Sequence, residues 1–274
     1  MTVVPDITLN NGQAIPQLGF GVFQVRPNAT VAAVTAALRV GYRHIDTAEM
    51  YGNERQVGEA IARSGVGRGD VFVTTKLNNG QHRPDAARRA FDASLKALGF
   101  DYVDLFLIHW PQARRGEFVG AWNTLEEFHR DGRARSIGVS NFHQHHLEAL
   151  FADGGTVPAV NQIEVHPYLT QDRLRAFCAE HQIAVEAWSP LARGRIAHDP
   201  AIAAIATATG RTPAQVVLRW HTQRGDIVFP KSVTPARIEE NFAIFDFELT
   251  GEQMAAISAL NRNQRTGPDP DSFG

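Results

Sequence analysis

The sequence has 274 residues, 43% of them hydrophobic, with 27 Lys and Arg against 29 Asp and Glu and a formal net charge of −2. That length and apolar content suffice for one large core, so we expect residues 1–274 to form a single domain. The balanced charge lacks the basic excess typical of proteins that bind nucleic acid or anionic membrane surfaces, and we expect neither partner.

The N-terminal segment MTVVPDITLN lacks the charged and then apolar pattern of a signal peptide, and no apolar run is long enough to span a bilayer. The single cysteine, Cys178, cannot form an internal disulfide, which fits a reducing compartment. Cys178 lies on the apolar stripe of LRAFCAEH, where a small buried hydrophobe is a better interpretation than a nucleophile. We expect a soluble cytoplasmic protein and, since nothing demands an oligomer, a monomer.

Strand-like and helix-like segments alternate along the chain. The first segment, ITLNNGQAI, predicts a β-hairpin with Asn11-Gly12 as a two-residue turn. Apolar, strand-like runs follow in the order LGFGVF, YRHID, VFVTT, VDLFLIH, SIGVS, AVNQIE, AVEAW and DIVFP. Apolar residues spaced three and four apart predict helices over residues 31–40, 55–63, 85–98, 119–130, 144–150, 172–181 and 202–207. Thr-Pro pairs at Thr212 and Thr234 predict the starts of two more helices.

This alternation predicts an α/β protein, a (β/α)8 TIM barrel with an N-terminal β-hairpin and extra C-terminal helices. An open doubly wound sheet is the rival fold. It usually has GxGxxG after its first strand, but GFGVFQ contains only Gly19 and Gly21 and no helix start follows. The polar, Pro- and Gly-rich tail NRNQRTGPDPDSFG predicts a surface extension.

Polar residues close most of the predicted strands. Catalytic groups of such a barrel project from the C-terminal ends of its strands, so these residues should line one mouth. Each one alone fits a helix cap, a solvated loop residue or a satisfied core histidine, whereas together they favour an active site. The strand ends are Asp46, Lys76, His109, Ser140-Asn141, Gln162 to Glu164, Trp188-Ser189 and Lys231-Ser232.

Three of these strand-end residues, together with Tyr51, suggest acid catalysis. Asp46 and Lys76 end adjacent strands and can form an ion pair, which would keep a partly buried ammonium charged. That ammonium near Tyr51 should favour the phenolate and lower the tyrosine pKa from about 10. His109 could orient a substrate oxygen. Because the set has no activated nucleophile, hydride must come from a cofactor.

A phosphate site is predicted after the last strand, in FPKSVTPARIEEN. Lys231 and Ser232 close the strand, Thr234 should cap the next helix, and Arg237 lies in its first turn. Backbone N–H groups, the helix dipole and two cations would meet there on one anion. A capped helix with two solvated cations is the simpler alternative.

The chain resembles the aldo-keto reductase family, and is similar to prokaryotic 2,5-diketo-gluconate reductase-like members. The segments GYRHIDTAEMYGNE, TTKL, LFLIHWP, SIGVSNF, VNQIEVHPY, PKSVTPARIEEN and FDFELT carry this resemblance nearly from end to end. The resemblance implies a catalytic tetrad of Asp46, Tyr51, Lys76 and His109, with Tyr51 as general acid. It also implies NADPH as cofactor, held by Gly21, Ser140, Asn141, Gln162, Trp188, Ser189, Leu191, Lys231, Ser232, Arg237, Glu240 and Asn241.

Substrate contacts are expected from Phe23, Asn78 and Trp110. Asn78 stands where many relatives have a tryptophan and Phe23 where many have another aromatic residue, so the family's substrates transfer poorly. Glu49 adds a charge where a small or apolar residue is commoner. We predict an NADP-dependent reductase of aldehydes or ketones, including dicarbonyls or keto-sugars, with a small carbonyl compound as its partner and no metal. One alternative is an NADPH-binding sensor with little turnover. Another is a metal-dependent hydrolase that uses His44, Asp46, His109 and His166.

Overall fold

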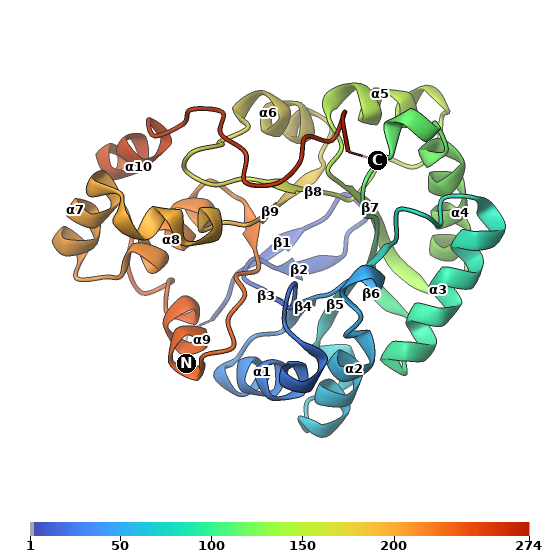
Figure 1. Ribbon diagram of the computed structural model, residues 1–274, viewed down its shortest axis with the longest axis horizontal. Coiled ribbons are helices and arrows are strands. Elements are labelled where there is room, and N and C mark those ends of the chain that lie inside the picture. Colours follow the sequence, from blue (N-terminus) through green and yellow to red (C-terminus); the bar gives the residue numbers. More distant parts are fainter. Residues whose placement is uncertain (1–2, 274) are drawn as a thin grey trace.

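The computed structural model describes residues 3–273, which form a (β/α)8 barrel (Figure 1). Eight parallel strands pair in chain order. A parallel bridge from Leu18 to Val228 joins the last strand to the segment before the first, so the barrel is nearly closed. The strands are β3 (Phe20–Gly21), β4 (His44–Asp46), β5 (Phe72–Leu77), β6 (Val103–Ile108), β7 (Ala134–Ser140), β8 (Val160–Glu164), β9 (Ala184–Trp188) and β10 (Ile227–Val228).

Helices surround the barrel and connect its strands (Figure 1). Those that alternate with the strands are α1 (Pro27–Val40), α2 (Glu54–Arg63), α3 (Pro84–Leu98), α4 (Phe118–Arg130), α5 (Gln144–Ala152), α6 (Asp172–Glu180), α8 (Pro213–Gln223) and α9 (Pro235–Phe242). Two more, α7 (Pro200–Thr209) and α10 (Gly251–Ser258), pack beside α8 at one side of the barrel. The predicted barrel and its extra C-terminal helices are confirmed. None of the helices within residues 3–273 is long and apolar enough to cross a membrane.

The N-terminal hairpin forms, but its turn differs from the prediction. Strands β1 (Asp6–Thr8) and β2 (Ala14–Pro16) pair antiparallel. The Leu9 amide donates to the Gln13 carbonyl and the Gly12 amide to the Leu9 carbonyl, which makes a three-residue loop. Gly12 has a φ of 83°, a left-handed conformation that follows a tight turn in such loops and that glycine adopts without steric cost. The predicted two-residue turn at Asn11-Gly12 was therefore wrong.

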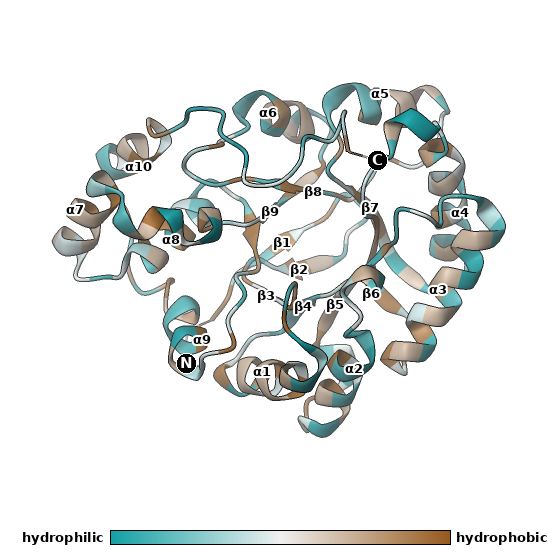
Figure 2. Cartoon of the chain, viewed as in Figure 1, coloured by the Kyte–Doolittle hydropathy of each residue, from teal (hydrophilic) through white to brown (hydrophobic). Residues whose placement is uncertain are grey.

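The main core lies between the outer faces of the strands and the helices. In Figure 2 the barrel strands are coloured mainly towards the hydrophobic end of the scale, while the helices carry both colours. Phe91 of α3 and Phe128 of α4 stack with ring centroids 4.3 Å apart, and Phe106 of β6 packs 4.5 Å from Phe91. This apolar layer fixes the strands, and so fixes the polar side chains at their C-terminal ends.

The C-terminal tail lies mostly exposed at the surface, as its composition predicts, and it is also hydrogen-bonded to the barrel. It runs back from α10 past the start of α6 and ends near α5 (Figure 1). Backbone amides of Arg262 and Gln264 donate to the Tyr168 carbonyl, and Thr266 and Gly267 donate to the Glu164 carboxylate at the end of β8. The tail thus packs against the ends of the strands where the polar residues gather.

Candidate active site

A buried ion pair joins the ends of β4 and β5. These strands are parallel neighbours, and Lys76 lies two residues beyond Thr74, which pairs with Asp46. The Lys76 Nζ is 2.8 Å from both carboxylate oxygens of Asp46 and 2.8 Å from the Thr47 carbonyl oxygen. Both side chains are almost wholly buried, at 0% and 1% exposed. Three acceptors therefore satisfy all three N–H donors of the ammonium, as a buried charge requires.

The ammonium stays charged inside the barrel. Burial alone would lower the pKa of Lys76, but the nearby Asp46 carboxylate and Tyr51 hydroxyl raise it above its ordinary value. A permanent positive charge at the mouth follows from this arrangement.

Tyr51 and His109 lie beside that charge. Tyr51 follows β4 in a short 3-10 turn (Glu49–Tyr51), and its ring centroid is 5.1 Å from the Lys76 Nζ. The His109 ring, directly after β6, is 5.8 Å from the Tyr51 ring in an edge arrangement. The structure thus brings together the four residues that the sequence suggested for acid catalysis.

The predicted lowering of the Tyr51 pKa was wrong. Burial raises the pKa of Tyr51 to about 12, although the Lys76 charge acts in the opposite direction. Desolvation disfavours the phenolate more than one ammonium favours it. The phenol consequently holds its proton at neutral pH, the state that a proton donor needs.

His109 is neutral at this site. Its pKa lies well below the ordinary value because burial, and then the positive charge of Lys76, oppose protonation. Within residues 3–273 nothing hydrogen-bonds its buried Nδ1. A neutral imidazole can hydrogen-bond a carbonyl oxygen without competing for the proton of Tyr51.

The sequence reasoning missed Glu186, a second carboxyl group inside the barrel. The Gln162 Nε2 donates to Asp46 Oδ2 at 2.9 Å and to Glu186 Oε2 at 2.8 Å. Burial, and then the negative charge of Asp46, raise the pKa of Glu186 to about 8. Its signal in the sequence was a lone acidic residue inside the apolar strand AVEAW.

Ser140, Asn141 and Trp188 form a connected group at the ends of β7 and β9. The Asn141 Nδ2 donates to the His109 carbonyl at 3.0 Å, and the Trp188 Nε1 donates to Asn141 Oδ1 at 2.8 Å. Ser140 Oγ donates to the Gln162 carbonyl. Asn141 and Ser189 adopt left-handed φ values of 64° and 50°, which turn the chain sharply as it leaves each strand. Leu191 follows, half-buried, in the loop after β9.

The predicted phosphate site lies at the start of α9. Lys231 and Arg237 are exposed there, and Ser232 and Asn241 are buried. Thr234 is the N-cap residue of α9, as predicted, but among residues 3–273 its side chain makes no capping hydrogen bond. Instead the Thr234 amide donates to Ser232 Oγ at 3.1 Å.

Two of the predicted cofactor residues have structural partners within the chain. Glu240 accepts a hydrogen bond at 2.8 Å from Thr212 Oγ1, the residue that caps α8 as predicted. A side chain on Gly21 would place its Cβ 2.6 Å from the Phe229 carbonyl, so glycine permits the close approach of β3 to the chain after β10.

Aromatic and polar side chains face each other at the substrate end. Phe23, 48% exposed, packs on Tyr51 with ring centroids 5.1 Å apart. Trp110 packs on Trp188 and, at 4.5 Å, on Phe273 of the tail. Half-buried Asn78 lies close to Glu49, whose pKa burial raises. Phe273 is a site residue that sequence reasoning missed.

The hydrolase alternative fails on geometry. The Lys76 ammonium occupies both oxygens of Asp46. His44 contacts Thr74 and Glu186, and His166 contacts Glu164, so these side chains do not converge with His109. An ammonium bound to the proposed ligand would repel a metal cation.

Comparison with known proteins decides the family. The family model described as "Aldo/keto reductase family" matches residues 17–262. The chain belongs to the aldo/keto reductase family. An aldo-keto reductase of Mycolicibacterium smegmatis is 53% identical over 98% of both chains. The methylglyoxal reductase DkgA of Yersinia pestis is 50% identical, over 100% of this chain and 99% of its own.

Solved structures of aldo-keto reductases have the same fold. A variant of the protein Gox0644, solved in complex with NADPH, is 42% identical with a TM-score of 0.96 over 100% of both chains. An aldo/keto reductase from Brucella melitensis is 51% identical with a TM-score of 0.92, over 95% of this chain and 99% of its own. These findings confirm the predicted family, the barrel fold and the enzyme class, an oxidoreductase. The roles assigned to single residues stay predictions.

Proposed function

We propose that this aldo-keto reductase reduces aldehydes or ketones to alcohols with hydride from NADPH, and that Tyr51 donates the proton. The observation that carries the proposal is the position of the Tyr51 ring 5.1 Å from an ammonium that Asp46 holds with two 2.8 Å hydrogen bonds. A pure nucleotide-binding sensor would not need a proton donor beside a buried cation.

The start of α9 suits the adenosine phosphate of NADPH. Lys231 and Arg237 are exposed cations at this point, and among residues 3–273 the Thr234 side chain makes no capping hydrogen bond. Helix N-termini with nearby Arg and Lys favour phosphate. Trp188, half-buried at the end of β9, offers a flat surface to the nicotinamide, and its Nε1 donates to Asn141 Oδ1.

The mechanism follows from the charges at the mouth. When bound, the nicotinamide supplies the hydride. Neutral His109 orients the substrate carbonyl by a hydrogen bond, and Tyr51 gives its proton to the oxygen as negative charge develops there. Lys76 then stabilises the phenolate that remains, while Asp46 keeps the lysine charged and in place.

Dicarbonyls and keto-sugars are the substrates that we favour. Apolar walls from Phe23 and Trp110 would accept a carbon chain, while the Glu49–Asn78 pair offers hydrogen bonds to a second oxygen. Relatives named methylglyoxal reductase support this choice.

The test follows the near-ultraviolet absorbance of NADPH against methylglyoxal, keto-sugars and aromatic aldehydes in parallel. We expect turnover that is fastest with the dicarbonyls or keto-sugars. Tight binding of NADPH without oxidation by any of these substrates would favour the sensor alternative instead.

A further inference from the structure

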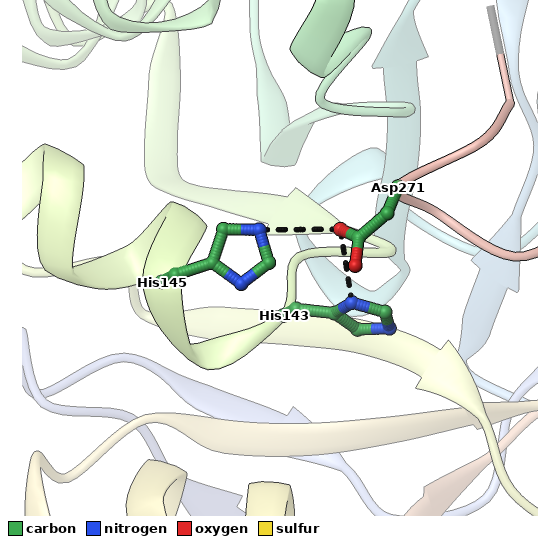
Figure 3. Close-up of side chains that lie close together, drawn as sticks. All are labelled: His143, His145 and Asp271. Carbon is green, nitrogen blue, oxygen red and sulfur yellow. Dashed lines mark ion pairs between the residues drawn. The ribbon is translucent and has the colours of Figure 1, made fainter.

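Three ligand-type side chains converge where the C-terminal tail meets α5 (Figure 3). His143 Nδ1 is 3.1 Å and His145 Nε2 3.2 Å from the same oxygen of Asp271. One ligand atom from each of the three residues lies within 4.8 Å of the others. Within residues 3–273 this is the one group of three or more His, Cys, Asp or Glu side chains with such geometry. The cluster lies outside the site built on Asp46 and Tyr51.

The spacing suits a tetrahedral zinc ion. Zn²⁺ binds imidazole nitrogen at about 2.0–2.1 Å and carboxylate oxygen at about 2.0–2.2 Å, so tetrahedral ligand atoms lie roughly 3.3 Å apart. The two separations from the Asp271 oxygen, 3.1 and 3.2 Å, are already close to that value. Only the two imidazoles would have to approach each other. His145 is 60% exposed, so it has room to do so.

Within the described part of the chain, the unpaired Nε2 of His146 independently supports an ion at this cluster. Its Nδ1 accepts the backbone N–H of His143, so in the neutral ring its Nε2 carries the hydrogen. That Nε2 is buried, lies 3.5 Å from the same Asp271 oxygen, and has no hydrogen-bond partner among residues 3–273. An N–H donor beside a ligating carboxylate is the usual outer support of a metal site.

The neighbouring charges favour a dication overall. Asp269 and Asp271 bring two negative charges, and Arg265 brings one positive charge through contacts with Asp269 and with His143 Nε2. Metal on His143 Nδ1 would place a hydrogen on Nε2, so Arg265 would have to release the imidazole. The Arg265 guanidinium would then keep its ion pair with Asp269, whose carboxylate is 3.3 Å from the Arg265 Nε.

We propose that His143, His145 and Asp271 bind one Zn²⁺ ion, with water as fourth ligand, and that this ion clips the C-terminal tail to the start of α5. Asp271 is two residues from Phe273, which packs 4.5 Å from Trp110 at the mouth. Holding Asp271 therefore holds an aromatic wall of the substrate end. The metal is structural, and its binding does not depend on the proposed reductase activity.

The first experiment is calorimetric titration of tag-free protein with zinc chloride. We expect one ion per chain for the wild type and at least about tenfold weaker binding for His145→Gln and for Asp271→Asn. His198→Gln, which removes an exposed histidine elsewhere, should bind like the wild type. Equal affinity in all four proteins, or no saturable binding by the wild type, would overturn the proposal.

Trypsin digestion supplies a second readout that does not use activity. Zinc should slow cleavage after Arg262 and Arg265 in the wild type and in His198→Gln, but not in Asp271→Asn. Unchanged cleavage of the wild-type tail on adding saturating zinc would mean that the ion does not clip it.

Discussion

The Gln162 amide links two carboxyl groups inside the barrel, with its Nε2 2.9 Å from Asp46 and 2.8 Å from Glu186. The Asp46 carboxylate is paired with Lys76, whereas within residues 3–273 Glu186 forms no ion pair with a lysine or arginine. His44 lies 3.6 Å from Glu186, but burial lowers the pKa of His44 to about 3, so it is neutral. Glu186 therefore holds a proton at neutral pH, which keeps a second negative charge away from Asp46.

Replacing Glu186 by Gln should make the fold more stable at high pH. The pKa of Glu186 rises from 4.5 to about 8 on folding. Its favourable contribution is fully present below pH 4.5 and is lost as the pH rises towards 8. The free energy of unfolding of Glu186→Gln relative to wild type should increase by at most about 1.4 kcal/mol per pH unit in that window. Urea denaturation at pH 5 and pH 8 measures it, and a difference independent of pH would argue against a protonated Glu186.

Lys76→Met should destabilise the protein strongly, because it leaves the buried Asp46 charge without its cation, with only the Gln162 amide still donating to it. Breaking a fully buried pair costs about 3–5 kcal/mol. The double variant Lys76→Met/Asp46→Leu removes both charges and should recover much of that loss. Denaturation of the three proteins tests this. If the double variant were as unstable as the single one, packing rather than charge would explain the effect.

Arg237→Ala should weaken NADPH binding by about tenfold or more and leave NADH binding nearly unchanged, because only NADPH carries the adenosine 2′-phosphate. Arg63→Ala, a variant of an arginine that is 71% exposed on α2, serves as the control. Fluorescence titration with each cofactor gives the comparison. Equal losses of affinity for the two cofactors would mean that Arg237 does not bind the 2′-phosphate.

Phe273→Ala should raise KM for carbonyl substrates several-fold while changing kcat and NADPH affinity little. The phenyl ring packs on Trp110 at the mouth, and within residues 3–273 it stacks on none of the four proposed catalytic residues. Steady-state kinetics with a dicarbonyl substrate would show whether KM rises while kcat stays nearly constant. A large fall in kcat with KM unchanged would assign the tail a different role.

The strand ends were readable from the sequence because parallel strands place their C-terminal residues at one rim. Asp46, Lys76 and His109 could thus be grouped without coordinates. Other features depend on distances that a sequence does not contain. Burial, and then the Asp46 charge, raise the pKa of Tyr51 against the lowering effect of Lys76, and the sequence indicated only the effect of Lys76. The packing of Thr266, Gly267 and Phe273 on the barrel involves partners about a hundred residues or more away.

The proton donor is the centre of the account, and Tyr51→Phe tests it most directly. This change removes one hydroxyl and keeps the aromatic contacts with Phe23 and His109. We predict that single-turnover reduction falls by roughly 10²–10⁴ while NADPH affinity stays within a few-fold of wild type. Tyr102→Phe, a change at a tyrosine that stacks on Arg135 instead, should be fully active. Reduction by Tyr51→Phe at the wild-type rate would contradict the mechanism.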